Sequence, residues 1–304
     1  MVDLRSLSLK QLRALSATIR TGSVTQAAAA LFVTPPAISI HLKSLERTVG
    51  QPLYVRSPEG LEATEIGREM LEAADEIEKV IDRARVRIEA LNAGAVGSVI
   101  LGVVSTGKYF APGIVARFRT AHPDIRVRLS IGNRTEIIKG LEHNEYDLLV
   151  MGRPPDHVPV AREVLGDHPH VLIAPPDHPL VGNPEILPED LLRETFLARE
   201  EGSGTRGLMI RFLDRIGGGR PFNMVEMGTN ETIKQAVMAG LGIAMISAHT
   251  CHSELGEGKL ATLQAEGLPM VRQWFLIYRT DRSLSRAAEI LHDFILAHKR
   301  EVLP

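Results

Sequence analysis

Three short helical segments within residues 9–50 constrain the fold more than any other feature of this sequence. Apolar residues recur at three- and four-residue spacing over residues 9–20, which is the period of an amphipathic helix. Gly22 ends this first segment. Ser23 followed by Gln26 has the spacing of a capping box, so we expect a short, alanine-rich second helix to begin there. A small helical module is therefore predicted at this end of the chain.

A third helix is predicted after a turn at Phe32-Val33. Thr34 suits its N-cap, and Pro35 suits its first position because the N–H that proline lacks would be unpaired there anyway. The expected buried face is Ile38, Leu42 and Leu45, with Ser39, His41, Lys43 and Arg47 projecting elsewhere. Two short helices joined by a tight turn, the second carrying polar and basic groups, are the parts of a DNA-reading helix-turn-helix. A purely structural three-helix unit is the alternative.

A β-hairpin is predicted directly after the third helix. Residues 53–55 are apolar, residues 58–60 form a Pro-Glu-Gly turn, and residues 61–63 return along the first strand. Arg56 lies where such a wing passes along a phosphate backbone or enters the minor groove. The wing and the basic charge of this segment favour DNA binding over a purely structural unit.

The charge of the chain is divided along its length. All 304 residues together carry 35 Lys and Arg against 37 Asp and Glu, a net charge of −2. Residues 1–60 hold seven basic and three acidic side chains, residues 61–94 hold five basic and nine acidic, and the remainder is close to neutral. A basic module joined to acidic and neutral ones suits a polyanionic partner, and ordinary scatter of surface charge is the alternative.

A long helix is predicted from its N-cap Thr64 to about Asn92. Its apolar residues alternate four- and three-residue spacing, which is typical of a coiled-coil stripe. The stripe consists of Ile66, Met70, Ala73, Ile77, Val80, Ala84 and Leu91, with Ile88 alongside. We expect two chains to pair through this helix, because a symmetric operator requires a two-fold protein. Packing of the stripe on its own domain is the alternative, and residues 93–97 are expected to form a hinge.

The N-terminal motif also carries a family resemblance. Its residues are Ala27-Ala28, Leu31, Val33-Thr34, Pro36-Ala37-Ile38-Ser39, Leu42-Lys43 and Leu45-Glu46. Together with the wing and the long helix, this pattern resembles the LysR-type transcriptional regulators. The resemblance implies DNA contact by Thr34, Pro36, Ala37, Ser39, Lys43 and Arg56, and Ser23 and His41 complete the candidates. The family usually has glutamine where this chain has Pro35; glutamine can hydrogen-bond a base edge and proline cannot, so base recognition at this position is open.

The C-terminal two thirds alternate strands and helices. Strands are predicted at residues 99–104, 125–131, 146–151, 170–174, 196–198, 223–227, 243–246 and 273–278. Helices are predicted at residues 110–121, 135–143, 188–192, 206–216, 230–239 and 284–299. This alternation predicts mostly parallel sheets, whose ligands bind at the carboxyl ends of the strands.

The resemblance implies the domain organisation. The fold class is α/β, with a winged helix-turn-helix domain dominated by helices, a long linker helix, and a two-lobed effector domain similar to periplasmic binding proteins. The expected boundaries are residues 1–63 for the DNA-binding domain, 64–94 for the linker and dimerisation helix, and 95–304 for the effector-binding domain. Lobe I comprises about 95–163 and 267–304, and lobe II about 164–266, with a ligand cleft between them.

Three strand-to-helix junctions in this domain carry small hydroxyl residues and backbone N–H groups at a predicted helix start. Helix N-termini favour anions, and nearby basic side chains add charge-assisted hydrogen bonds. The candidates for binding an anionic effector are Ser105, Thr106, Lys108, Asn133, Arg134, Gly202, Ser203, Thr205, Arg206, Thr229, Asn230 and Glu231. Ordinary helix capping is the alternative for any single junction, and the conjunction of three favours a site.

Several of these segments resemble one subgroup, the regulators of Calvin-cycle (RuBisCO) operons. They are residues 105–110 (STGKYF), 132–134, 201–206 and 230–243. The resemblance implies activation of carbon-fixation genes in response to a metabolite such as ribulose bisphosphate, phosphoenolpyruvate, NADPH or ATP, with no resident cofactor. It also implies a pseudo-palindromic DNA operator and an assembly that is commonly tetrameric. A LysR-type regulator of another metabolic operon is the alternative.

A small-molecule enzyme or binding protein on the same two lobes is the rival class. The sequence has no G-x-S-x-G, G-x-x-x-x-G-K-[ST] or H-E-x-x-H motif, so no enzyme is predicted. The lone Cys251 is expected to be buried and incidental, and no metal site is predicted at His168, His170 and His178. A single cysteine and no secretion signal favour the cytoplasm, and no apolar run approaches the roughly 20 residues of a membrane span.

Overall fold

The computed structural model describes residues 4–57, 60–92 and 97–303 and has the predicted mixture of helices and strands. Its contacts divide it into two compact units, Met1–Arg85 and Val86–Pro304, each of which is described by itself. The division falls within the long helix.

The helices of the N-terminal unit follow the predicted segments. In order they are η1 (Leu4–Ser6), α1 (Leu9–Thr21), α2 (Val24–Ala30) and α3 (Pro35–Val49). Gly22, with φ +65°, ends α1, and Ser23 Oγ accepts a hydrogen bond from Gln26 N at the start of α2. Thr34 occupies the N-cap of α3 in extended conformation, as predicted, and its side chain makes no capping hydrogen bond to the described start of the helix.

These helices enclose one apolar core. The predicted buried face of α3, Ile38, Leu42 and Leu45, packs there against Leu12 and Leu15 of α1. Within the described part of the chain, no single helix is long and apolar enough to cross a membrane. The bent pair of α2 and α3 passes that test on length and composition, as core helices do, and its apolar residues lie in this core.

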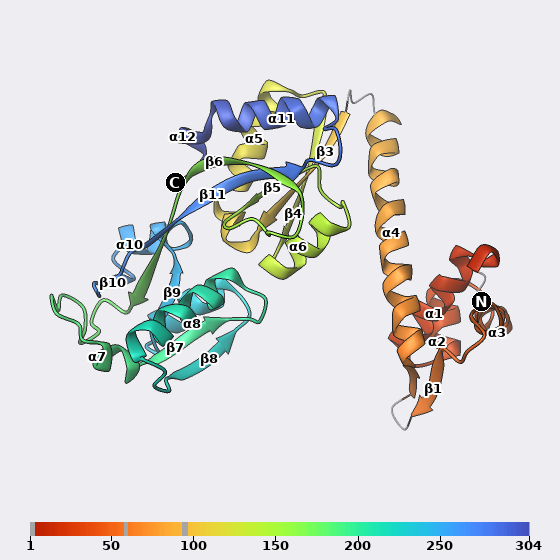
Figure 1. Cartoon of the computed structure of the whole chain (residues 1–304), viewed down its shortest axis with the longest axis horizontal. Helices are drawn as coiled ribbons and strands as arrows, with labels where there is room; N and C mark the ends of the chain where they lie inside the picture. The colour runs from red at the N-terminus through yellow and green to blue at the C-terminus, as the bar shows by residue number, and fades with distance from the viewer. Residues whose placement is uncertain (1–3, 58–59, 93–96, 304) are drawn as a thin grey trace. The chain divides into compact units, whose positions relative to one another are not determined.

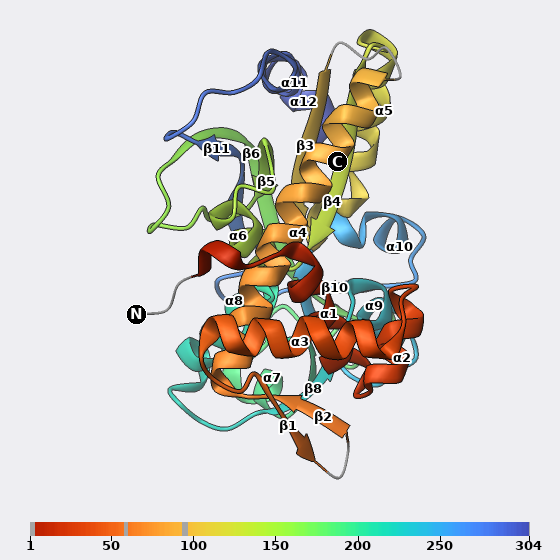
Figure 2. The same cartoon turned by 90° about the vertical axis from the view of Figure 1, so that its right-hand side faces the viewer.

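The predicted wing is present in the N-terminal unit (Figure 2). Strands β1 (Tyr54–Ser57) and β2 (Gly60–Ala63) pair antiparallel, with Arg56 opposite Leu61. Residues 58–59 of the predicted turn lie outside the described residues.

The long helix α4 (Glu65–Asn92) begins as predicted. Thr64 Oγ1 accepts a hydrogen bond of 3.0 Å from Gly67 N and caps the helix. A Cβ atom on Gly67 would lie 2.0 Å from Leu53 O, so only glycine permits this close approach of α4 to the chain that enters the wing. Helix α4 is further joined to α1 by two hydrogen bonds from the Arg13 guanidinium to the Glu78 carboxylate.

The predicted stripe of α4 is divided between the core and solvent. Met70 is buried in the core of the N-terminal unit together with Ala74, so this part packs on its own domain. The exposed apolar residues in the described part of α4 are Ile66, Ile77, Val80, Ile81, Ala84 and Ile88. The side chain of Leu91 and most of the predicted hinge, residues 93–96, lie outside the described residues. Gly97 begins a strand, so it was wrongly placed in the hinge.

The C-terminal unit consists of two lobes joined by two long strands (Figure 1). Lobe I contains β3 (Gly97–Val104), η2 (Ser105–Tyr109), α5 (Ala111–Ala121), β4 (Ile125–Gly132), α6 (Arg134–Glu142), β5 (Leu148–Met151), α11 (Arg286–Ala297) and α12 (Lys299–Val302). Lobe II contains α7 (Pro188–Leu192), β7 (Thr195–Arg199), α8 (Gly204–Gly217), β8 (Asn223–Met227), α9 (Asn230–Met238), β9 (Ala244–Ser247), η3 (Ala248–Thr250), α10 (His252–Gly256) and β10 (Ala261–Leu263). The joining strands are β6 (Val160–Ala174) and β11 (Met270–Arg279).

The main sheet is mixed. Its order is β10-β6-β11-β5-β3-β4, with β9 also paired to β6. Strand β3 pairs parallel with β4 and β5, and β7 pairs parallel with β8. Strand β6 pairs antiparallel with β9, β10 and β11, and β11 with β5. The expectation of mostly parallel sheets was therefore wrong, because β6 and β11 run between the lobes as an antiparallel pair.

The sequence also predicted only the last third of β6. Residues 160–169 lack a continuous apolar run and contain Gly166 and Pro169, both of which argue against a strand. Pairing with β11 over its full length extends β6 back to Val160. Tertiary pairing thus overrides the local signal.

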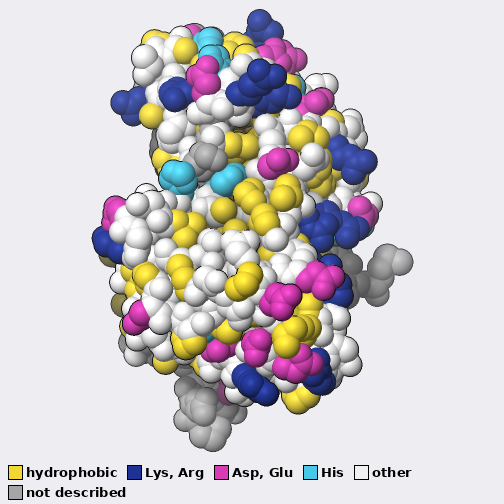
Figure 3. Space-filling model, turned by 90° about the vertical axis from the view of Figure 1, so that its left-hand side faces the viewer, with side chains coloured by type: hydrophobic (Ala, Val, Ile, Leu, Met, Phe, Trp, Pro, Cys, Tyr) yellow, Lys and Arg dark blue, Asp and Glu magenta, His cyan; other side chains and the backbone are white. Residues whose placement is uncertain are grey.

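Each lobe of the C-terminal unit has its own core. Trp274 and Phe118 are fully buried in lobe I, and Phe196 and Phe212 in lobe II. The register of β11 against β6 shifts just after Trp274, so an irregularity lies where the two strands pass between the lobes. On the face that Figure 3 shows, acidic and basic side chains are interspersed, in keeping with the near-neutral charge of this part of the sequence.

Candidate functional site

A pocket of about 350 Å³ lies between the two lobes of the C-terminal unit. Its lining residues are Ser105, Lys108, Ile131, Gly132, Asn133, Glu136, Arg199, Glu200, Gly228, Thr229 and Asn230. They lie at or just after the carboxyl ends of β3, β4, β7 and β8, which is where ligands of α/β sheets bind. Five predicted effector-binding residues are among them: Ser105, Lys108, Asn133, Thr229 and Asn230.

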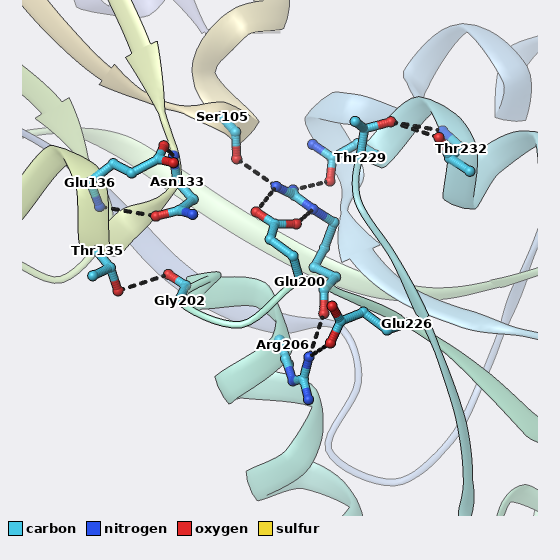
Figure 4. Close-up of polar contacts among 12 residues, drawn as sticks. Ser105, Asn133, Thr135, Glu136, Glu200, Gly202, Arg206, Glu226, Thr229 and Thr232 are labelled. Atoms are coloured by element: carbon cyan, nitrogen blue, oxygen red, sulfur yellow. Dashed lines mark hydrogen bonds and ion pairs between the residues drawn. The ribbon is translucent and has the colours of Figure 1, made fainter. Parts of the chain in front are cut away.

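Arg199, the last residue of β7, is the central charged group of the pocket. Its side chain is 3% exposed and donates to both carboxylate oxygens of Glu200, at 2.6 and 2.7 Å. It also donates to Ser105 Oγ at 3.1 Å and to Asn230 Oδ1; Figure 4 shows Ser105 and Glu200. Because Ser105 belongs to lobe I and Arg199 to lobe II, this contact joins the lobes. Arg199 was not among the predicted effector-binding residues, although a charge directly after a predicted strand was an available signal.

Asn230, the first residue of α9, has a polar group without a partner. The residue is 2% exposed, and its Oδ1 accepts from Arg199 Nη1. Among the described residues its buried Nδ2 has no hydrogen-bond partner, although the Tyr109 hydroxyl group lies beside it. An unpaired buried donor costs about 1–3 kcal/mol, so an acceptor on a bound molecule would relieve this cost.

A charged cluster beside the pocket forms a second contact between the lobes. Tyr109 Oη in lobe I donates to Glu231 Oε1 in lobe II at 2.5 Å. The buried Lys234 Nζ pairs with Glu254 Oε1 at 2.6 Å and Glu231 Oε2 at 3.1 Å, and Lys108 Nζ lies 3.8 Å from Glu231 Oε1. Both ammonium groups lie about 5 Å from the centre of the Tyr109 ring, within cation–π range.

This cluster shifts two pKa values. Burial, and then the hydrogen bond to Glu231, raise the pKa of Tyr109, so its hydroxyl keeps its proton. Burial alone would raise the pKa of Glu231, but the hydrogen bonds from Tyr109 and Lys234 outweigh it and the pKa is lowered. Glu231 is therefore a carboxylate at neutral pH and acts as the acceptor.

A third contact between the lobes lies at the start of α6. Asn133 and Glu136 form a capping box, in which Asn133 Oδ1 accepts from Glu136 N at 3.0 Å and Glu136 Oε2 accepts from Asn133 N at 2.7 Å. The neighbouring Thr135 donates from N and Oγ1 to Gly202 O in lobe II, at 3.3 and 3.4 Å (Figure 4). The cap occupies Asn133 Oδ1, so Asn133 can offer a ligand its Nδ2 group.

Seven predicted effector-binding residues do not line the pocket: Thr106, Arg134, Gly202, Ser203, Thr205, Arg206 and Glu231. The Arg206 guanidinium pairs with Glu226 and donates to Arg199 O at 3.2 Å (Figure 4). Arg134 Nη1 donates to Arg153 O. Both predicted anion-binding arginines thus have protein partners elsewhere, because contacts made by folding direct them away from the pocket.

The three predicted junctions also differ from one another. Residues 105–109 form the 3-10 helix η2 rather than the start of an α-helix, so the expected helix N-terminus is absent there. Ser203 is the N-cap of α8 without a side-chain capping bond. Thr229 Oγ1 caps α9 by accepting from Thr232 N at 3.0 Å. Only α9 therefore brings an α-helix N-terminus to the pocket among these junctions.

The predicted DNA-contact residues lie at the N-caps of α2 and α3, on α3 and on the wing of the N-terminal unit, whose elements Figure 2 shows. Thr34, Pro36, Lys43 and Arg56 are exposed, and Ser23, Ala37, Ser39 and His41 are half-buried. Two of the hydroxyl groups have local partners: Ser39 Oγ donates to Pro35 O at 3.1 Å, and Ser23 Oγ caps α2.

The cysteine and the histidines singled out in the sequence lie in packed surroundings. Cys251 is fully buried, and burial followed by the charge of Glu254 raises the pKa of its thiol to about 12, so it is not a thiolate at neutral pH. His168 stacks on Trp274 with ring centres 3.8 Å apart, and Trp274 Nε1 donates to His249 Nδ1 at 3.1 Å. Among the described residues, no group of three or more His, Cys, Asp or Glu could hold a metal ion.

Two family descriptions match the chain. "Bacterial regulatory helix-turn-helix protein, lysR family" matches residues 9–68, and "LysR substrate binding domain" matches residues 92–300. The chain belongs to the LysR family of transcriptional regulators. LysR regulators bind DNA operators and small-molecule effectors, and the two units of this chain correspond to those tasks. The rival class of a small-molecule enzyme is set aside, because the relatives are transcriptional regulators.

Named LysR relatives match over the full length. The chain is 48% identical to the HTH-type transcriptional regulator CbbR of Cereibacter sphaeroides over 306 residues, which cover 100% of this chain and 99% of that protein. It is 41% identical to the RuBisCO operon transcriptional regulator of Allochromatium vinosum over 291 residues, which cover 96% of each.

Two solved LysR structures are also similar. The regulatory domain of CcmR from Synechocystis PCC6803, in complex with 2-PG, matches with a TM-score of 0.62 and 33% identity, covering 67% of this chain and 97% of that one. Full-length CbnR complexed with its target DNA matches with a TM-score of 0.73 over 97% of this chain and 100% of that one. At 21% identity, the second likeness shows the fold alone.

Proposed function

We propose that this LysR regulator activates Calvin-cycle carbon-fixation (RuBisCO) genes in response to an anionic, phosphorylated metabolite bound between its two lobes. The names of CbbR of Cereibacter sphaeroides and of the RuBisCO operon regulator of Allochromatium vinosum support the target genes. The solved complex of the CcmR regulatory domain with 2-PG supports a small-molecule effector in this part of the chain.

The observation that carries the effector proposal is the unpaired Nδ2 group of Asn230 beside Arg199 in the pocket. The two carboxylates of the pocket already have partners, since Glu200 binds Arg199 and Glu136 caps α6. Asn230 Nδ2, Asn133 Nδ2 and the Lys108 ammonium group can donate to a ligand. Phosphate oxygens accept from all three, and hydrogen bonds that involve a charge are the stronger ones.

Such an effector acts by touching both lobes. Ser105, Lys108 and Asn133 belong to lobe I, and Thr229 and Asn230 to lobe II. A ligand that contacts both sets favours one arrangement of the lobes to the extent that it binds that arrangement more tightly. We further propose that the chain acts in the cytoplasm as a homodimer paired through the exposed side of α4, and as a homotetramer on its operator.

A thermal-shift screen of the full chain tests the effector. The compounds are ribulose bisphosphate, phosphoenolpyruvate, NADPH, ATP and inorganic phosphate; the effector raises the melting temperature because it binds the folded state. Asn230→Asp keeps an acceptor for Arg199 but replaces the free donor with an acceptor, so it weakens binding of the stabilising compound by at least about tenfold in calorimetry. Asn183→Asp is the matched control, because Asn183 lies outside the pocket and an aspartate there keeps the oxygen that accepts from Glu185 N.

Two results would contradict the proposal about the effector: no compound stabilises the chain, or Asn230→Asp binds the effector as well as the unchanged chain does. The target genes are tested separately. The chain should retard a duplex from upstream of the RuBisCO genes in a gel in preference to an unrelated duplex, and equal retardation of both duplexes would favour the alternative, a LysR regulator of another operon.

A further inference from the structure

One face of α3 in the N-terminal unit points to solvent as a narrow stripe. Pro36, Ile40, Lys43 and Arg47 are all exposed and are spaced by four, three and four residues, so they lie one above another on the helix. We call these four residues the α3 stripe. The buried residues Ile38, Leu42, Leu45 and Val49 repeat the same spacing on the opposite side, which fixes the stripe to face away from the core.

Ile40 is the unexpected member of the α3 stripe. It is 65% exposed at the middle of the stripe, between a proline one turn before it and a lysine one turn after it. No large apolar side chain elsewhere on α3 is this exposed. A solitary exposed isoleucine is unremarkable on a general surface, but this one lies on the helix that LysR proteins of this fold use as the second helix of a helix-turn-helix.

The first half of α3 offers little hydrogen-bonding chemistry to a base edge. Pro35 and Pro36 have no side-chain donor or acceptor, and the Ser39 hydroxyl donates to Pro35 O at 3.1 Å. The N-terminal half of the recognition helix is the part that meets base edges in the major groove. The exposed side chains of that half, Pro35, Pro36 and Ile40, present only carbon atoms, whereas Ser39 and His41 are half-buried.

We propose that Ile40 reads thymine by packing against its C5-methyl group in the major groove. The thymine methyl is the one apolar group on the major-groove edges of the four base pairs, so it is the group that an aliphatic side chain can select. Lys43 and Arg47 on the same stripe indicate that the partner is a polyanion. An apolar protein surface docked here would bury both positive charges without partners. The proposal goes beyond the proposed target genes and effector and depends on neither.

The test removes the methyl group from the DNA and the side chain from the protein. The full chain is used to select a high-affinity duplex from a randomised pool, and each thymine of that duplex is then replaced by deoxyuridine, which lacks only the C5-methyl. We expect replacement at one thymine in each half-site to raise Kd about fourfold, the equivalent of ~0.8 kcal/mol for one buried methyl group.

The same replacement should have no effect on Ile40→Ala, because the contact is already gone. Ile40→Val, which keeps part of the side chain, should retain part of the sensitivity and serves if Ile40→Ala binds too weakly to measure. The salt dependence of binding should be unchanged in Ile40→Ala, since no phosphate contact is removed. Leu4→Ala, which trims another exposed aliphatic side chain of this unit, is the control and should keep the sensitivity.

The proposal is overturned if no thymine replacement weakens binding. It is equally overturned if the effects of deoxyuridine and of Ile40→Ala are additive at every thymine, because independent effects mean that the two groups do not touch. An altered oligomeric state of Ile40→Ala with an intact response to deoxyuridine would instead make Ile40 a contact between protein chains.

Discussion

The hydroxyl group of Tyr109 in η2 donates a 2.5 Å hydrogen bond to Glu231 Oε1 at the start of α9, and so links lobe I to lobe II beside the pocket. Neither residue lines the pocket, yet each is a direct neighbour in sequence of one that does, Lys108 and Asn230. We expect a ligand that moves these neighbours to strain or relieve the Tyr109–Glu231 contact. The contact would then couple occupancy of the pocket to the arrangement of the lobes.

Removing the hydroxyl group of Tyr109 tests this link. Tyr109→Phe keeps the ring near Lys108 and Lys234 but deletes the hydrogen bond, so we expect unfolding to cost ~1 kcal/mol less and the melting temperature to fall by about 2–4 °C. Calorimetry of the full chain measures this. Tyr278→Phe is the control, because its hydroxyl has no hydrogen bond within the described part of the chain. Equal melting temperatures for Tyr109→Phe and the unchanged chain would show that this hydrogen bond does not stabilise the contact between the lobes.

The positions of two basic residues predict different effects on effector binding. Lys108 lines the pocket, whereas the Arg206 guanidinium faces Glu226 and Arg199 O. We expect Lys108→Ala to weaken binding of the stabilising metabolite about tenfold, as the loss of a charge-assisted hydrogen bond does, and Arg206→Ala to change it less than twofold. Titration calorimetry compares the two. The sequence predicted both residues to bind the effector, and an equal or larger effect of Arg206→Ala would restore that interpretation for Arg206.

Buried histidines make the stability of the C-terminal unit depend on pH. Burial, then the nearby His170 and His249, lower the pKa of His168 to about 2; burial lowers the pKa of His170 to about 4, with Arg272 and His249 adding to the effect. Both side chains stay neutral in the folded chain below pH 6.5, where they take up protons on unfolding. Stability is therefore full above about pH 6.5 and falls towards pH 4, by up to ~1.4 kcal/mol per pH unit for each histidine.

His168→Phe separates this effect from the protonation of carboxylates. Phenylalanine keeps the stack on Trp274 and cannot titrate. The slope of unfolding free energy against pH between 6.5 and 4 should therefore decrease by ~1.4 kcal/mol per pH unit, which corresponds to one proton fewer taken up on unfolding. Denaturant unfolding at several pH values measures the slope. The exposed His252→Phe is the control, and an identical slope in His168→Phe would show that His168 does not contribute.

The exposed Arg56 on β1 should contribute to DNA affinity through phosphate rather than bases. We expect Arg56→Ala to weaken binding to all duplexes alike and to reduce the slope of log K against log salt concentration by about 0.9. Gel retardation or fluorescence anisotropy at several salt concentrations measures it. Arg286→Ala, exposed in the C-terminal unit, should leave the slope alone. An unchanged slope in Arg56→Ala would exclude it from the phosphate contacts.

The exposed apolar side of α4 predicts how chains pair. Val80 is 53% exposed on this side, and a charge there would be buried without a partner in a paired helix. We expect Val80→Glu to shift sedimentation of the chain towards the monomer, with the N-terminal unit still folded by circular dichroism. Glu72→Gln, exposed on the same helix, is the control. A dimer of unchanged stability in Val80→Glu would place the interface elsewhere.

The caps and glycines of the N-terminal unit were predictable because their causes are local. Gly22 and Ser23 act through their own backbone or their nearest neighbours in sequence. The spacing of the apolar residues in α3 indicates which face of the helix is buried. The same local signals placed most strands and helices of the C-terminal unit. They failed for the first part of β6, where pairing with β11 rather than composition makes the strand.

The sequence alone predicted that three short helices, a wing and a long helix precede an alternating α/β unit, and it named five of the residues that line the pocket. The tertiary structure alone decided which charges face it. Arg199 and Arg206 are equally basic in the sequence, but folding buries one against Ser105 and Asn230 and turns the other to Glu226. The reason is physical: the burial and pairing of a charge depend on residues that are distant in sequence, and no local pattern records them.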